Sequence, residues 1–183
     1  PNIARVTQGI GPVPFMAAYL ALFAVSALAL LIVTHINIPP VVVSEVHGPA
    51  RPLLEIMRQP VFLTALIGSS VGYAVMIMVM TATPLAMQMC GQSLGSSATV
   101  IQWHVLGMFL PSLVAGSLVD RWGAKPVAWI GALLLAASAA IALSGLSATL
   151  FLVSSLLLGA GWNFMLLAGT TLLTLAHSPE ERA

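Results

Sequence analysis

His104 has the strongest potential for chemistry, because it lies inside an apolar run that contains no Asp, Glu, Lys or Arg from Gln59 to Val119. Histidine titrates near physiological pH, and an ionisable group in so apolar a segment is a functional candidate by default. His104 could bind or relay a proton. Alternatively, it is a neutral ring that bonds to a neighbouring helix or to water. Gln102 adds to this polar signal.

A polar stripe runs along the last apolar segment, where Ser155, Gly159, Asn163 and Thr170 are separated by 4, 4 and 7 residues. This spacing places them on one side of a helix, with Trp162 beside them. An Asn side chain is costly in hydrocarbon, so Asn163 is expected to face a cavity or another helix. Contact with a ligand and hydrogen bonding between helices explain it equally well.

Tyr73, Met76 and Met80 share one helix face at the spacing i, i+3, i+7. Methionine is adaptable and suits a promiscuous pocket, but a packed helix interface is the more common explanation of such a face. Gly68 and Gly72 form a small-xxx-small pair that permits close packing. The three larger side chains are therefore candidates for a substrate pathway, with helix packing as the alternative.

Other kinds of site lack the residues they need. The single cysteine, Cys90, excludes an internal disulfide and a multi-cysteine metal site, and the four histidines have no metal-ligand spacing. We find no glycine-rich phosphate loop and no nucleophile–base arrangement. The sequence therefore predicts neither an enzyme nor a cofactor or metal site. A net charge of +1 gives no sign of nucleic-acid binding.

The composition requires a membrane protein. Only 6% of residues are charged and 59% are hydrophobic, with a mean hydropathy of +1.03, whereas a soluble domain carries about 25% charged residues. Backbone groups in lipid must be bonded internally, and these continuous apolar runs can do so only as helices. We expect an all-α bundle of about five transmembrane helices, near residues 14–36, 60–87, 98–119, 126–143 and 149–175.

Polar connections separate these spans. Residues 1–40 hold an outer flank and the first span, residues 41–59 a cytoplasmic loop, and residues 60–183 the other four spans. Within the loop, Pro52–Arg58 could form a short helix on the membrane surface. Turns are expected at residues 90–97, 120–125 and 144–148. Pro84 and Pro111 are expected to bend their helices.

The basic residues define an orientation. With five spans, only Arg5 falls on one side, and the positive-inside rule makes the opposite side cytoplasmic. The N-terminus is then outside and the C-terminus inside, as for a multi-pass protein of a bacterial inner membrane. The basic residues on the cytoplasmic side are Arg51, Arg58, Arg121, Lys125 and Arg182.

The turn after the third span contains a pattern that can act as a conformational switch. Gly116 lets a neighbouring helix approach closely. Asp120 and Arg121 can pair across a helix end, as a latch made in one state and broken in another. Gly123 permits a tight turn, and Lys125 anchors the start of the next helix. The whole segment reads GSLVDRWGAK.

This segment is similar to the loop signature of the major facilitator superfamily, G-x-x-x-D-[RK]-x-G-x-[RK]. The family keeps it between helices two and three and repeats it more weakly between helices eight and nine. The long polar connection at residues 41–59 resembles the family's central loop. The resemblance implies a fragment with helices six to ten of a twelve-helix carrier, in which seven and ten line the cavity and six and nine face lipid.

Two functions remain open. The resemblance implies secondary active transport of a small organic solute, as an efflux or metabolite carrier, by alternating access. Its partners would be the lipid bilayer, a small-molecule substrate and the missing transmembrane helices of the same carrier. The alternative is a small membrane scaffold or assembly protein that oligomerises and transports nothing. It would need oligomerisation to cover Gln102, His104 and Asn163.

Overall fold

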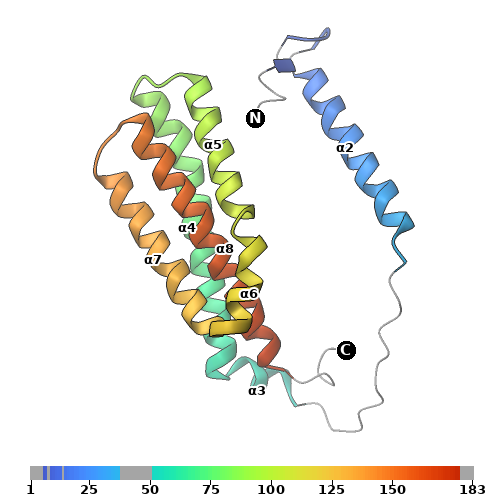
Figure 1. Cartoon of the computed structure of the whole chain (residues 1–183), viewed down its shortest axis with the longest axis vertical. Coiled ribbons are helices and arrows are strands. Elements are labelled where there is room, and N and C mark those ends of the chain that lie inside the picture. Colours follow the sequence, from blue (N-terminus) through green and yellow to red (C-terminus); the bar gives the residue numbers. More distant parts are fainter. Residues whose placement is uncertain (1–5, 8, 14, 38–50, 178–183) are drawn as a thin grey trace. The chain divides into compact units, whose positions relative to one another are not determined.

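The computed structural model describes residues 6–7, 9–13, 15–37 and 51–177, where all the long elements are helices. Five helical stretches there, with α5 and α6 counted together, are long and apolar enough to cross a membrane. The predicted all-α class is confirmed. The helices are α2 (Met16–His35), α3 (Leu53–Met57), α4 (Pro60–Met89), α5 (Leu94–Phe109), α6 (Ser112–Trp122), α7 (Ala124–Leu143) and α8 (Ala148–Leu175) (Figure 1).

Helix α2 belongs to the first of two compact units, residues 1–46, and is described by itself. Its 20 residues extend about 30 Å, which matches the hydrocarbon core of a bilayer. None of its residues is buried within the described chain. The Thr34 hydroxyl donates to the Leu31 carbonyl at 2.7 Å, so this polar group is satisfied inside the helix. The predicted span agrees with α2, although Pro14 lies outside the described residues.

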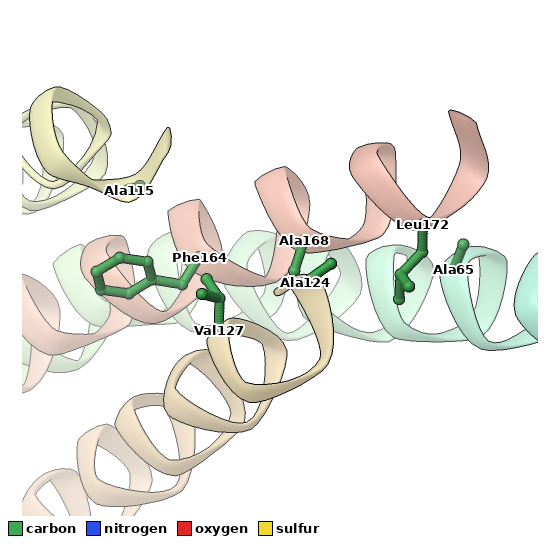
Figure 2. Packing of buried hydrophobic residues seen from close by; sticks show 7 residues of the cluster. All are labelled: Ala65, Ala115, Ala124, Val127, Phe164, Ala168 and Leu172. Carbon is green, nitrogen blue, oxygen red and sulfur yellow. The ribbon is translucent and has the colours of Figure 1, made fainter. Parts of the chain in front are cut away.

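Helix α8 is the centre of the second unit, residues 47–183, because α4, α5 and α7 all pack against it (Figure 1). Its buried residues recur from Phe151 to Leu172. Figure 2 shows the largest core cluster, in which α8 side chains meet small residues of α4, α6 and α7. The cluster consists of Ala65, Ala115, Ala124, Val127, Phe164, Ala168 and Leu172.

Glycines set how closely α5 and α7 approach α8. A Cβ added at Gly159 would clash with the His104 carbonyl oxygen, and one at Gly107 would lie 2.5 Å from the Leu156 carbonyl oxygen. Gly131 and Gly161 form the corresponding contact between α7 and α8, with 2.9 Å from either added Cβ to the other's carbonyl oxygen. Without a hydrophobic driving force in lipid, such backbone contact is a main source of helix association.

The third span is broken at Leu110 and Pro111, between α5 and α6. Proline has no N–H to donate to the carbonyl four residues earlier, which here belongs to Gly107. The Ser112 hydroxyl donates to the Phe109 carbonyl at 2.5 Å, which satisfies one group freed by the break. The break falls at Pro111, where the sequence predicts a bend. Helix α4 continues through Pro84, so a bend there stays a prediction.

Two turns are shorter than predicted. Gly123 has φ +84° and by itself connects α6 to α7, so the expectation of a turn over residues 120–125 is wrong. A left-handed glycine reverses the chain at little steric cost and lets both helices continue to it. The turn predicted at residues 90–97 is also too long, because the Ser93 hydroxyl caps α5 by accepting the Ser96 N–H at 3.0 Å.

The expected short helix before α4 is present as α3. Its flanks are attached to the C-terminal end of α8. The Gln59 side chain donates to the Ala176 carbonyl at 3.0 Å, and the Arg51 guanidinium donates to the same oxygen at 3.4 Å. These bonds satisfy a carbonyl that the helix end leaves without an N–H partner.

Candidate functional site

The switch residues lie where α6 meets α7. Asp120 and Arg121 are in the last turn of α6, and Lys125 is in the first turn of α7. Figure 1 shows α3 at the same end of the second unit. Arg58, Arg121 and Lys125 therefore lie at one end of the bundle, as the five-span topology predicts.

Asp120 is exposed and forms no ion pair with any residue that the structure describes. A carboxylate in the last turn of a helix lies at the unfavourable, negative end of the helix dipole, and Arg121 in the same turn offsets only part of this effect. Gly116 has nothing within 4 Å of an added Cβ. Both residues are thus open to a partner outside the described helices.

His104 is buried between α5 and α8, with 2% of its surface exposed. Its Nδ1 lies 2.9 Å from the Ser155 carbonyl oxygen. A carbonyl oxygen only accepts, so Nδ1 carries the proton and the neutral ring has Nε2 as its acceptor. Nε2 has no hydrogen-bond partner within the described chain. The geometry satisfies one ring nitrogen across the helix contact and leaves the other able to accept a proton.

The polar stripe of α8 changes environment along its length. Ser155 and Gly159 are buried against α5. Asn163 is half-buried, and its Oδ1 is enclosed with no partner among the described residues, as is Nε1 of Trp162. Thr170 is exposed, and its hydroxyl bonds to the Leu166 and Leu167 carbonyls of its own helix.

The three candidates on α4 separate in the structure. Met76 is 4% exposed on the face of α4 that contains the buried Gly72, whereas Tyr73 is 52% exposed. Met80 and Gln102 are half-buried. Among the described residues, no hydrogen bond joins Tyr73, Gln102, His104 or Asn163 to one another. The candidates thus occupy one bundle without forming one connected cluster.

An apolar groove of about 300 Å³ is lined by residues of α4, α7 and α8, with Lys125 among them. Its lining includes Gly68, Ala128, Ala132, Met165 and Gly169.

The bundle contains a buried pair of hydrogen-bonded serines that the sequence does not indicate as a pair. The Ser138 hydroxyl donates to the Ser154 carbonyl at 2.8 Å, and the Ser154 hydroxyl donates to the Ser138 carbonyl at 2.9 Å. Ser138 is the only polar residue between Trp129 and Leu143, but nothing in the sequence spacing indicates Ser154 as its partner. The pair joins α7 to α8.

No group of three or more His, Cys, Asp or Glu residues in the described part of the chain could hold a metal ion. The polar groups of the bundle instead offer single donors and acceptors. Such groups suit a neutral or weakly charged solute, or hydrogen bonding between helices.

A comparison with protein families identifies the family of the chain. Residues 69–183 match the family model described as Major Facilitator Superfamily. The chain belongs to the major facilitator superfamily. It is therefore a multi-pass membrane protein of a transporter family, as the resemblance predicted.

Curated relatives of this superfamily chain point the same way. It is 39% identical to the riboflavin transporter RfnT of Brucella anthropi over 165 residues, which are 90% of this chain and 41% of the relative. It is 42% identical over 111 residues to the uncharacterised MFS-type transporter YdeG of Bacillus subtilis, covering 60% of this chain and 26% of that protein. The chain spans less than half the length of both. No solved structure matches it.

Proposed function

We propose that the whole protein is a secondary active transporter of a small organic solute. The observation that carries this proposal is the 39% identity to a riboflavin transporter over 90% of the chain. Transport by alternating access requires a site near the bilayer midplane and helices that rock around it. The enclosed, unpartnered polar atoms of α5 and α8 support such a site.

Riboflavin is the first candidate substrate. The similarity to the riboflavin transporter RfnT supports it. So does the presence of an indole donor and an amide acceptor, Trp162 and Asn163, on the central helix. A flat heteroaromatic ring with carbonyl and N–H groups could stack on the indole and bond to the amide. We propose that Asn163 and Trp162 contact the substrate. Tyr73 and Thr170 are proposed as further contacts, because they lie on faces of α4 and α8 that the described helices leave exposed.

His104 is proposed as a proton site of the transport cycle. Within the described spans it is the buried ionisable side chain, and its Nε2 is free to accept a proton. Protonation there would place a charge in an apolar contact, so it would favour a state in which α5 and α8 separate or admit water. Helix packing with a permanently neutral ring is the competing role.

The remaining helices of the carrier are proposed to complete the bundle. The apolar groove between α4 and α7 supports this, because a membrane helix can fill it with side chains. We further propose that the spans correspond to helices six to ten, in a bacterial inner membrane. The N-terminus of the chain would be outside and its C-terminus cytoplasmic, because five of the six basic residues fall on one side.

Uptake by the full-length protein tests the proposal. The gene would be expressed in a bacterial strain that neither makes nor imports riboflavin, and radiolabelled riboflavin would be followed in cells and in inside-out vesicles. We expect saturable riboflavin movement that N163A weakens. Movement of other solutes but not riboflavin would overturn the substrate. No movement of any solute in a panel of vitamins and drugs would overturn transport.

A further inference from the structure

Helix α3 has the surface pattern of a membrane-interface helix. Successive helix residues are about 100° apart, so Leu53, Leu54 and Met57 fall within one arc of about 100°. All three are exposed, at 70%, 58% and 41% of their surface. Glu55 lies on the opposite side, and Ile56 is buried against the bundle. An apolar arc of this width on a water-facing helix would be costly, whereas lipid would cover it.

The position of α3 brings this arc to the level of the lipid head groups. Helix α4 begins at Pro60, directly after Arg58 and Gln59, and its 30 residues extend about 45 Å. The hydrocarbon core is only about 30 Å thick, so the ends of α4 reach the polar interface. The bonds from Arg51 and Gln59 to the Ala176 carbonyl hold α3 beside the end of α8, a second helix of comparable length.

Arg58 supplies the charge that an interfacial helix needs. It lies at the edge of the apolar arc, is exposed, and forms no ion pair with any described residue. A guanidinium group binds phosphate through two parallel N–H groups, which favours the phosphate of a phospholipid as its partner. Anionic lipids attract such basic residues next to a span.

We propose that α3 is a membrane-interface anchor, in which Leu53, Leu54 and Met57 insert into the leaflet while Arg58 binds the phosphate of an anionic phospholipid. The partner is the lipid surface itself. This inference requires only that α4 and α8 span the membrane, so it holds whatever solute the carrier moves.

Spin labels would report the depth of α3 in the full-length protein. Labels would be attached at L54C and at E55C in a cysteine-free background and reconstituted into vesicles of phosphatidylcholine with phosphatidylglycerol. We expect the label at position 54 to be more accessible to oxygen than to a water-soluble nickel complex, with the reverse at position 55. High nickel accessibility at position 54 would overturn the proposal. So would protection from both reagents, which would mean that protein covers the arc.

Binding of the head group has a separate readout. The relative affinity for spin-labelled phosphatidylglycerol over phosphatidylcholine would be measured for the native protein, R58Q and R58K. One basic residue near an anionic lipid surface changes the relative lipid affinity by about fivefold. We expect R58Q to lose that preference and R58K to retain most of it. An equal preference in R58Q and the native protein would overturn the role of Arg58.

Discussion

At the scale of single residues, the polar side chains of the bundle fall into two groups. The hydroxyl groups of Thr64, Thr83 and Thr170 donate hydrogen bonds to carbonyls of their own helices. His104 and Ser138 bond instead to carbonyls of α8. Only the second group can hold two helices together, so substitutions there are expected to affect stability.

His104→Leu is expected to lower the free energy of unfolding by about 1 kcal/mol, because it removes the hydrogen bond to the Ser155 carbonyl. Ser155→Ala is the matched control, since the backbone carbonyl remains. Reversible denaturation of the full-length protein in mixed micelles measures both. Equal stability of His104→Leu and the native protein would contradict the bond. A transport rate that no longer varies with pH in His104→Gln would support the proton role.

Gly159→Ala is expected to destabilise the protein by about 1–3 kcal/mol, because the new methyl group meets the His104 carbonyl of α5. Gly68→Ala is the control. Its methyl group meets only the Met165 Cε, at an ordinary 3.6 Å, while the gain in helix propensity is the same. Thermal unfolding in detergent compares them. The prediction fails if the two variants unfold at the same temperature.

At the scale of elements, the break between α5 and α6 is the irregular feature of the third span. Pro111 leaves the Gly107 carbonyl without its helical N–H partner, close to the Gly107–Gly159 contact. Such interruptions absorb changes of backbone angle when helices move. Helix α4 also contains a proline, Pro84, but continues through it.

Pro111→Ala is therefore expected to slow transport at unchanged expression, by allowing α5 and α6 to join into one stiffer helix. Pro84→Ala should slow it less, because α4 is already continuous there. Initial rates of uptake by the full-length carrier, normalised to protein in the membrane, provide the comparison. Equal rates for Pro111→Ala and the native protein would rule out the break as a point of flexure.

The contact between α7 and α8 depends on a reciprocal pair of serines. Ser138→Ala and Ser154→Ala are each expected to lower the free energy of unfolding by about 0.6–1.7 kcal/mol, the size of hydrogen bonds between membrane helices. The two losses should be nearly additive in the double variant, because each substitution removes one donor and leaves the backbone carbonyl that accepts from the other serine. Each hydroxyl donates to the other residue's carbonyl, and the two oxygens are 3.1 Å apart. Unfolding in mixed micelles measures the single and double variants, and unchanged stability in both single variants would contradict a role for these hydrogen bonds in the contact.

At the scale of the whole molecule, the exposed end of α6 is expected to matter only when the rest of the carrier is present. Asp120 has no ion-pair partner among the described residues and faces the negative end of its own helix dipole. A partner on another part of the carrier, engaged in one state of the transport cycle, would compensate this cost.

Asp120→Asn should reduce transport by about fivefold or more, as expected when a contact that favours one of two states is lost. Glu55→Gln is the matched control, because it neutralises another exposed carboxylate at the same end of the second unit. Expression and folding should be unchanged in both variants. Transport kinetics identical to those of the native protein would count against the switch.

The amino-acid sequence by itself determined the number of spans, their helical type and the family. In lipid every backbone group must be bonded within its own segment, so an apolar run of sufficient length leaves only one secondary structure. The GSLVDRWGAK segment carried the family resemblance because its residues have fixed spacing within one short stretch.

Only the tertiary structure decided which polar groups face another helix. Helical periodicity gives the side of a helix on which His104 or Asn163 lies, but not the neighbour opposite that side. That neighbour depends on where helices cross, and the Gly107–Gly159 contact sets the crossing that brings His104 to the Ser155 carbonyl. The turn lengths at Gly123 and Ser93 depend on the positive φ of the glycine and on the serine cap, and a hydropathy profile shows neither.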